Sequence, residues 1–97
     1  MSKKMLFVYN PMAGKEQIRN KLSDIIQTFC RAGFEVTIFA TMGREDATKI
    51  VAEKGRKYDY VVCSGGDGTM NEVATGLMKI ESEKRPICGY IPAGTVN

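Results

Sequence analysis

The sequence predicts an α/β domain of three α/β/α layers, with a parallel sheet of about four strands between helices. Short apolar runs that are typical of buried strands alternate with longer amphipathic patterns, in the order β-α-β-α-β-α-β. This alternation favours parallel strands joined by crossover helices. The chain has 97 residues, which is enough for one core, so we expect residues 1–97 to form a single unit.

The four expected strands are apolar runs rich in β-branched and aromatic residues, and each is bounded by glycine, proline or charged residues. They span residues 5–9, 34–40, 58–64 and 86–91. If the loops after the first and third strands meet, those strands are neighbours and the order is 2-1-3-4. The alternative order, 3-2-1-4, would bring the loops after the first and fourth strands together instead.

The three expected helices span residues 15–32, 45–57 and 69–80. In the first, apolar residues form one helical face that runs from Ile18 to Cys30, and Gly33 is a typical residue to follow a helix. In the third, helical spacing predicts an inward face of Met70, Val73, Ala74, Leu77 and Met78.

Composition excludes several function classes. The net charge is +3 without a dense basic cluster interleaved with aromatic residues, so no nucleic-acid partner is expected. The absence of histidine excludes histidine acid–base chemistry within these residues. Three cysteines match no zinc spacing, and Cys63 and Cys88 are expected to be small core residues. The first apolar run is too short for a signal peptide or a membrane span, so we expect a cytoplasmic protein.

The segment from Gly65 to Thr69 (GGDGT) carries the strongest functional signal. Its glycines allow a ligand to approach the backbone closely, and the start of the following helix favours an anion such as phosphate. Asp67 would repel a phosphate unless Mg²⁺ or a ligand hydroxyl lay between them. The alternative is structural: Asp67 only caps the helix. Thr69 is expected either to cap the helix or to contact phosphate.

The other glycine-containing loops lie at the same end of the predicted sheet. Residues 10–14 follow the first strand, 92–97 follow the fourth, and Thr41 directly follows the second. Ligands of parallel α/β sheets bind at the carboxyl ends of the strands. These loops are therefore expected to surround one binding site.

Three segments together resemble the diacylglycerol kinase catalytic domain, especially the soluble bacterial lipid kinases of that family. They are YNPMAGK after the first strand, GGDGTMNEVATGL after the third and IPAGTVN after the fourth. GGDGT alone would also fit the related NAD kinases, and a variant of it occurs in phosphofructokinases. The combination of N-P-x-x-G, N-E-V and P-x-G-T-x-N favours a lipid kinase over an NAD kinase.

The resemblance implies transfer of the γ-phosphate of ATP to a lipid hydroxyl, such as that of diacylglycerol, with Mg²⁺ present. Asp67 matches the family's motif aspartate, which is needed for activity near the phosphates and the metal. No metal ligand is assigned with certainty in this chain. The positions that match the family's nucleotide-binding segments are Asn10, Pro11, Met12, Ala13, Gly14, Thr41, Gly65, Gly66, Asp67, Gly68, Thr69, Met70, Asn71, Glu72 and Thr95.

Members of this family are considerably longer and carry a second, β-rich domain that faces the lipid. That domain supplies further metal ligands and the general base. We therefore expect residues 1–97 to be the N-terminal part of a nucleotide-binding domain that is inactive alone, from a parent that contacts the inner face of the membrane peripherally. The exposed edge of the sheet could also pair with a second copy to form a homodimer.

Three alternatives remain at this point. An NAD kinase-type enzyme would carry the same glycine turn but phosphorylate a nucleotide. A non-catalytic nucleotide-binding module would carry the same loops without transferring phosphate. A flavodoxin-like binding domain would place aromatic residues in its binding loops, and tyrosine and phenylalanine are not concentrated in these loops.

Overall fold

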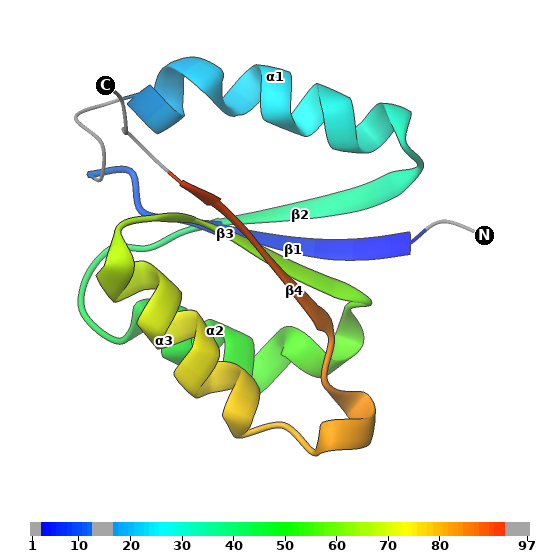
Figure 1. Ribbon diagram of the computed structural model, residues 1–97, viewed down its shortest axis with the longest axis vertical. Helices are drawn as coiled ribbons and strands as arrows, with labels where there is room; N and C mark the ends of the chain where they lie inside the picture. The colour runs from blue at the N-terminus through cyan, green and yellow to red at the C-terminus, as the bar shows by residue number, and fades with distance from the viewer. Residues whose placement is uncertain (1–2, 13–16, 93–97) are drawn as a thin grey trace.

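The computed structural model describes residues 3–12 and 17–92, and Figure 1 shows them as a sheet between two layers of helix. Every expected strand and helix is present, and two short 3-10 turns are added, at Gly55–Lys57 and Ser82–Lys84. The main elements are β1 (Lys3–Tyr9), α1 (Gln17–Arg31), β2 (Phe34–Ala40), α2 (Asp46–Lys54), β3 (Tyr60–Gly65), α3 (Asp67–Met78) and β4 (Ile87–Pro92).

The sheet is parallel throughout, and its strand order is β2-β1-β3-β4. The predicted order 2-1-3-4 is therefore confirmed. Phe7 in β1 pairs with Ile38 of β2 and Val62 of β3, and Val62 pairs in turn with Gly89 of β4. Since β1 and β3 are neighbours, their carboxyl ends lie side by side, and the backbone N–H of Asn10 donates a hydrogen bond to the oxygen of Ser64.

Helices cover the two faces of the sheet separately (Figure 1). On one face, Leu22, Ile25 and Phe29 of α1 pack against a cluster that contains Phe7 and Val62. On the other, α2 and α3 pack against the opposite side chains of β1 and β3. This second cluster contains Leu6, Val8, Ala47, Val51, Val61, Cys63, Val73, Leu77 and Ile80.

Helices α2 and α3 approach each other closely at Gly76. A Cβ atom added to Gly76 would lie 2.8 Å from the backbone oxygen of Thr48 and 2.8 Å from Cβ of Val51. Contacts this short do not occur between real atoms of these kinds, so only glycine fits. The hydroxyl of Thr48 also donates a hydrogen bond to the backbone oxygen of Glu72, at 2.8 Å.

Several predictions of burial were wrong. Cys88 is exposed because β4 is an edge strand. In α3 the inward face is rotated toward Gly76, which leaves Ala74 exposed and Met78 70% exposed. In α1, Cys30 is exposed rather than inward. Cys63 is buried as expected.

The observed start of α3 also differs from the start expected from the sequence. Helix α3 begins at Asp67, two residues before the expected start at Thr69. Asp67 therefore lies in the first turn of the helix rather than in the preceding loop. None of the helices within residues 3–12 and 17–92 is long and apolar enough to cross a membrane.

Candidate functional site

A cavity of about 280 Å³ lies where the carboxyl ends of β1 and β2 meet the start of α3. It brings together five of the residues predicted from the sequence and adds two that were not, Gly43 and Arg44. The lining residues are Asn10, Thr41, Gly43, Arg44, Gly68, Thr69 and Glu72. The predicted positions Ala13, Gly14 and Thr95 lie outside the described residues.

The turn between β3 and α3 presents free backbone donors. Gly66 precedes the helix in an extended conformation, and no side chain caps the helix there. The first hydrogen bond of the helix runs from the N–H of Met70 to the oxygen of Gly66, at 3.2 Å. The N–H groups of the preceding residues have no partner within the helix, and the helix dipole adds partial positive charge. This end of α3 is suited to an anion.

Thr69 does not cap the helix, because it is the third helical residue and is only 8% exposed. Its hydroxyl oxygen lies 2.6 Å from the position that a Cβ of Gly65 would take. The hydroxyl of Tyr90 in β4 donates a hydrogen bond to the backbone oxygen of Gly65, at 2.9 Å. Glycine at position 65 is thus a steric requirement, and Tyr90 is a contact to the turn that the sequence did not reveal.

Asn10 and Thr41 tie neighbouring strands together at the edge of the cavity. The side-chain oxygen of Asn10 accepts a hydrogen bond from the backbone N–H of Met12. The backbone N–H of Asn10 donates a hydrogen bond to the backbone oxygen of Ser64. The N–H of Thr41 donates to the oxygen of Tyr9. These bonds fix the ends of β1, β2 and β3 relative to one another.

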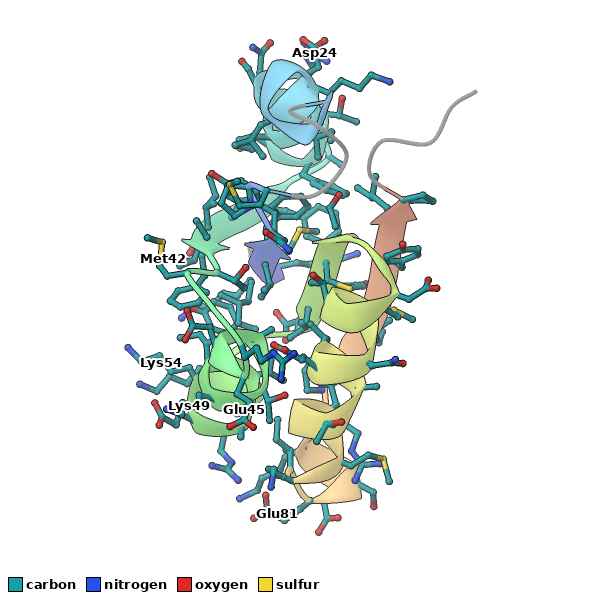
Figure 2. All side chains as sticks on the ribbon, turned by 90° about the vertical axis from the view of Figure 1, so that its left-hand side faces the viewer. Asp24, Met42, Glu45, Lys49, Lys54 and Glu81 are labelled. Atoms are coloured by element: carbon teal, nitrogen blue, oxygen red, sulfur yellow. The ribbon has the colours of Figure 1, made fainter. Side chains whose placement is uncertain are left out.

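The loop that follows β2 adds the cation of the site. Arg44 is the only basic residue among the described residues that line the cavity. Met42, in the same loop, is 84% exposed and projects away from the sheet in Figure 2. Arg44 had no distinguishing signal in the sequence, because a single arginine in a loop is common.

Asp67 is exposed at the first position of α3, beside Gly68 but outside the lining of the cavity. The residue that caps α3 is Gly66, and Asp67 is the acidic residue of its first turn, beside the positive end of the helix dipole. Within the described part of the chain, no group of three or more histidine, cysteine, aspartate or glutamate side chains could hold a metal ion alone.

The two remaining predicted positions of this segment differ in exposure. Met70 packs against the core, where the thiol of Cys63 donates a weak hydrogen bond to its sulfur. Burial, and secondarily the charge of Cys88, raise the pKa of the Cys63 thiol to about 12. Asn71 is exposed on the outer side of α3. Met70 and Asn71 therefore follow the turn in the sequence but do not line the cavity.

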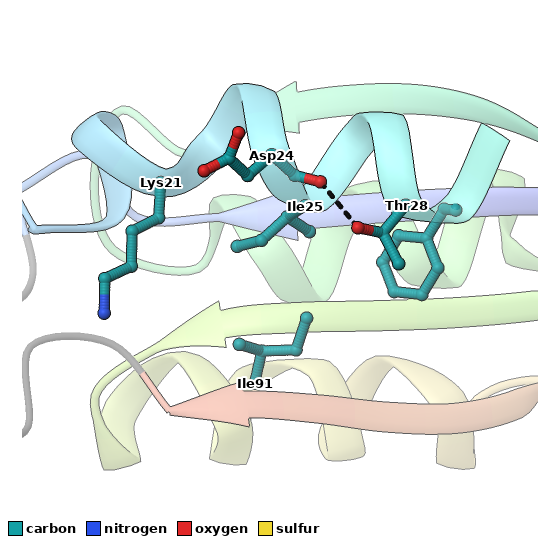
Figure 3. A pocket seen from close by; sticks show the side chains of 6 residues that line it. Lys21, Asp24, Ile25, Thr28 and Ile91 are labelled. Carbon is teal, nitrogen blue, oxygen red and sulfur yellow. Dashed lines mark hydrogen bonds between the residues drawn. The ribbon is translucent and has the colours of Figure 1, made fainter. Parts of the chain in front are cut away.

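A second hollow, of about 320 Å³, lies between α1 and β4 (Figure 3). It is mostly apolar, with Ile25, Phe29 and Ile91 in its wall, and it shares no residue with the cavity at the strand ends. It holds none of the glycine loops. We therefore place the functional site at the smaller cavity.

Comparison with known proteins shows the family of the chain. Residues 4–97 match the diacylglycerol kinase catalytic domain. The chain is 43% identical over 99 aligned residues to a diacylglycerol kinase of Staphylococcus haemolyticus, and 40% identical over 96 to one of Bacillus subtilis. These alignments cover 100% and 98% of this chain but only 29% and 31% of the relatives.

A solved structure leads to the same family. The crystal structure of a diacylglycerol kinase from Bacillus anthracis superposes with a TM-score of 0.83 and 36% sequence identity. The match covers 96% of this chain and 34% of that one, so the chain spans about a third of the length of the proteins it resembles. The chain belongs to the diacylglycerol kinase catalytic domain family.

Proposed function

We propose that residues 1–97 form the N-terminal part of the nucleotide-binding domain of a lipid kinase. This kinase transfers the γ-phosphate of ATP to a lipid hydroxyl, such as that of diacylglycerol. The observation that supports the proposal is the cavity in which Asn10, Thr41 and Thr69 meet the free N-terminus of α3. Because the chain belongs to the diacylglycerol kinase catalytic domain family, ATP and a lipid hydroxyl are the substrates we propose.

The phosphates of ATP fit the start of α3. Free N–H groups and the helix dipole attract negative charge there, and Gly68 leaves room for close approach. Arg44, from the loop that follows β2, supplies a cation in the lining of the same cavity. Phosphoryl transfer depends mainly on positioning and on neutralising charge, which is what these groups provide.

Asp67 is suited to bind Mg²⁺ together with the phosphates and water, rather than as one member of a site made only of protein ligands. Magnesium usually keeps several waters and is held by one or two carboxylates together with substrate phosphates. Asp67 is an exposed carboxylate at the edge of the phosphate site, whereas the carboxylate of Glu72 already accepts a hydrogen bond. Asp67 would hold the ion, directly or through a water, and the ion would neutralise charge on the phosphates.

The lipid surface, the general base and further metal ligands belong to the remainder of the longer protein. The chain alone is therefore inactive in lipid phosphorylation. A lipid acceptor implies that the whole protein contacts the inner face of the membrane from the cytoplasm. Ile87 and Tyr90, exposed along the edge strand β4, are the residues through which two copies would associate.

The test uses the full-length kinase that carries this sequence. It is offered labelled ATP with Mg²⁺ and either diacylglycerol in mixed micelles or NAD. Transfer to diacylglycerol, lost in Asp67→Ala, is the expected result. Transfer to NAD instead would favour the NAD kinase alternative. ATP binding without transfer to either acceptor would favour a non-catalytic module, and near-normal turnover of Asp67→Ala would contradict the role given to this carboxylate.

A further inference from the structure

We propose that Glu72 is a positioning residue that holds the loop between β2 and α2 in the conformation that completes the cavity. The inference rests on the proposed function, since the loop position affects catalysis only if the cavity binds a nucleotide. The Glu72 carboxylate accepts a hydrogen bond from the backbone N–H of Glu45, with Oε2 and N 3.0 Å apart. Glu72 belongs to α3 and Glu45 directly precedes α2, so this bond joins two walls of the cavity.

The residue that donates this hydrogen bond, Glu45, has an unfavourable backbone conformation. Glu45 has φ 69° and ψ 0°, the left-handed conformation. Within the described residues it is the only non-glycine residue with positive φ. This conformation is costly for an L-residue with a Cβ, and it persists where the surroundings enforce it. The Glu72 carboxylate is such a restraint, because it fixes the N–H of the strained residue.

The rest of the loop is tied in a complementary way. The carboxylate of Asp46 accepts a hydrogen bond from the N–H of Met42, with a distance of 2.6 Å. The backbone oxygen of Glu72 accepts a further bond from the hydroxyl of Thr48. Residues 42–45 are thus held at both ends, at Met42 by Asp46 and at Glu45 by Glu72, while the bond from Thr48 ties α2 itself to Glu72. This loop presents Gly43 and Arg44 to the cavity.

A direct role of Glu72 in binding is the competing explanation, because its side chain also lines the cavity. The two roles need different properties of the side chain. Positioning needs an oxygen that reaches the Glu45 N–H, and glutamine supplies one without a charge. A role in metal or phosphate chemistry needs the charge, and aspartate retains it while placing the carboxylate one methylene short of Glu45.

The experiment compares Glu72→Gln and Glu72→Asp in the full-length kinase that carries this sequence. We measure ATP affinity by calorimetry, and amide hydrogen exchange of the peptide spanning residues 41–46 by mass spectrometry without nucleotide. Glu72→Asp is expected to weaken ATP binding about tenfold, because a hydrogen bond to a charged group is lost. It also accelerates exchange in the peptide, whereas Glu72→Gln stays within about threefold of wild type in affinity.

A second substitution tests the strain. Glycine adopts the left-handed conformation without the penalty of a Cβ. Glu45→Gly in the Glu72→Asp background is therefore expected to recover at least about threefold in ATP affinity. Glu53, an exposed glutamate of α2, provides the matched control. Its Gln and Asp variants should both equal wild type.

The outcomes separate the inference from the function on which it rests. If Glu72→Asp behaves as wild type while Glu72→Gln loses affinity, the charge matters and the positioning role is wrong. Unchanged hydrogen exchange in Glu72→Asp overturns the inference in the same way. A wild-type kinase that binds no ATP overturns the proposed function first, and with it the role of Glu72 in catalysis.

Discussion

Replacing Gly65 by alanine places a methyl group against Thr69, at the start of the helix that we assign to phosphate binding. The added carbon would lie 2.6 Å from Oγ1 and 2.8 Å from Cβ of Thr69. The distance to Cβ is well below the usual separation of about 3.5–4.0 Å between non-bonded carbon atoms, and the distance to Oγ1 is also too short for a real contact of a Cβ atom. Thr69 is buried and cannot turn away freely, so the helix start or the end of β3 must move.

Overpacking of this kind costs about 1–3 kcal/mol, and we expect Gly65→Ala to lower the free energy of unfolding by about 2 kcal/mol. The measurement is urea unfolding followed by circular dichroism. Gly68→Ala is the matched control, because nothing lies within 4 Å of its added Cβ. Alanine is favoured over glycine inside helices by about 1 kcal/mol, so this variant should be at least as stable as wild type. Equal stability of the two variants would refute the steric reasoning.

Three further predictions concern the sheet beside the site. Tyr90→Phe removes the hydrogen bond to the oxygen of Gly65 and should cost about 1 kcal/mol in urea unfolding; an unchanged midpoint would contradict it. Ser64→Ala should stabilise the fold by about 1 kcal/mol in the same assay, because its buried hydroxyl has no hydrogen-bond partner among the described residues. The Cys63 thiol should resist iodoacetamide at pH 8 while Cys30 reacts, because burial raises the Cys63 pKa to about 12. As that folded-state pKa lies above the ordinary value of 9.0, stability should fall as pH rises from 9 toward 12; rapid labelling of native Cys63, or flat stability over that range, would count against it.

The order of elements could be predicted because the helices carry an amphipathic period and the strands are short apolar runs rich in β-branched and aromatic residues. The strand order followed from one functional premise, that the loops after β1 and β3 meet. The start of α3 could not be placed, because its first apolar residue is Met70 and the preceding turn contains only glycine, aspartate and threonine. Periodicity detects a buried face, and the first turn of α3 has little of one.

The loop after β2 shows a different limit. Gly43 is the residue that the sequence would favour for a left-handed backbone, yet the positive φ falls on Glu45. The reason is the carboxylate of Glu72, 27 residues away, which binds the N–H of Glu45. A contact across such a distance in sequence leaves no local pattern. The same holds for Tyr90, which reaches Gly65 from β4.

The close approach at Gly76 sets the spacing of the site from a remote position. Gly76 lies ten residues beyond Gly66, or about 15 Å along α3, and faces the backbone of α2. A side chain there would act as a wedge between the two helices and stretch the Thr48–Glu72 and Glu45–Glu72 bonds together. The width of the cavity at the strand ends is therefore set by a residue that does not line it, and engineering that changes this width could begin at the helix interface.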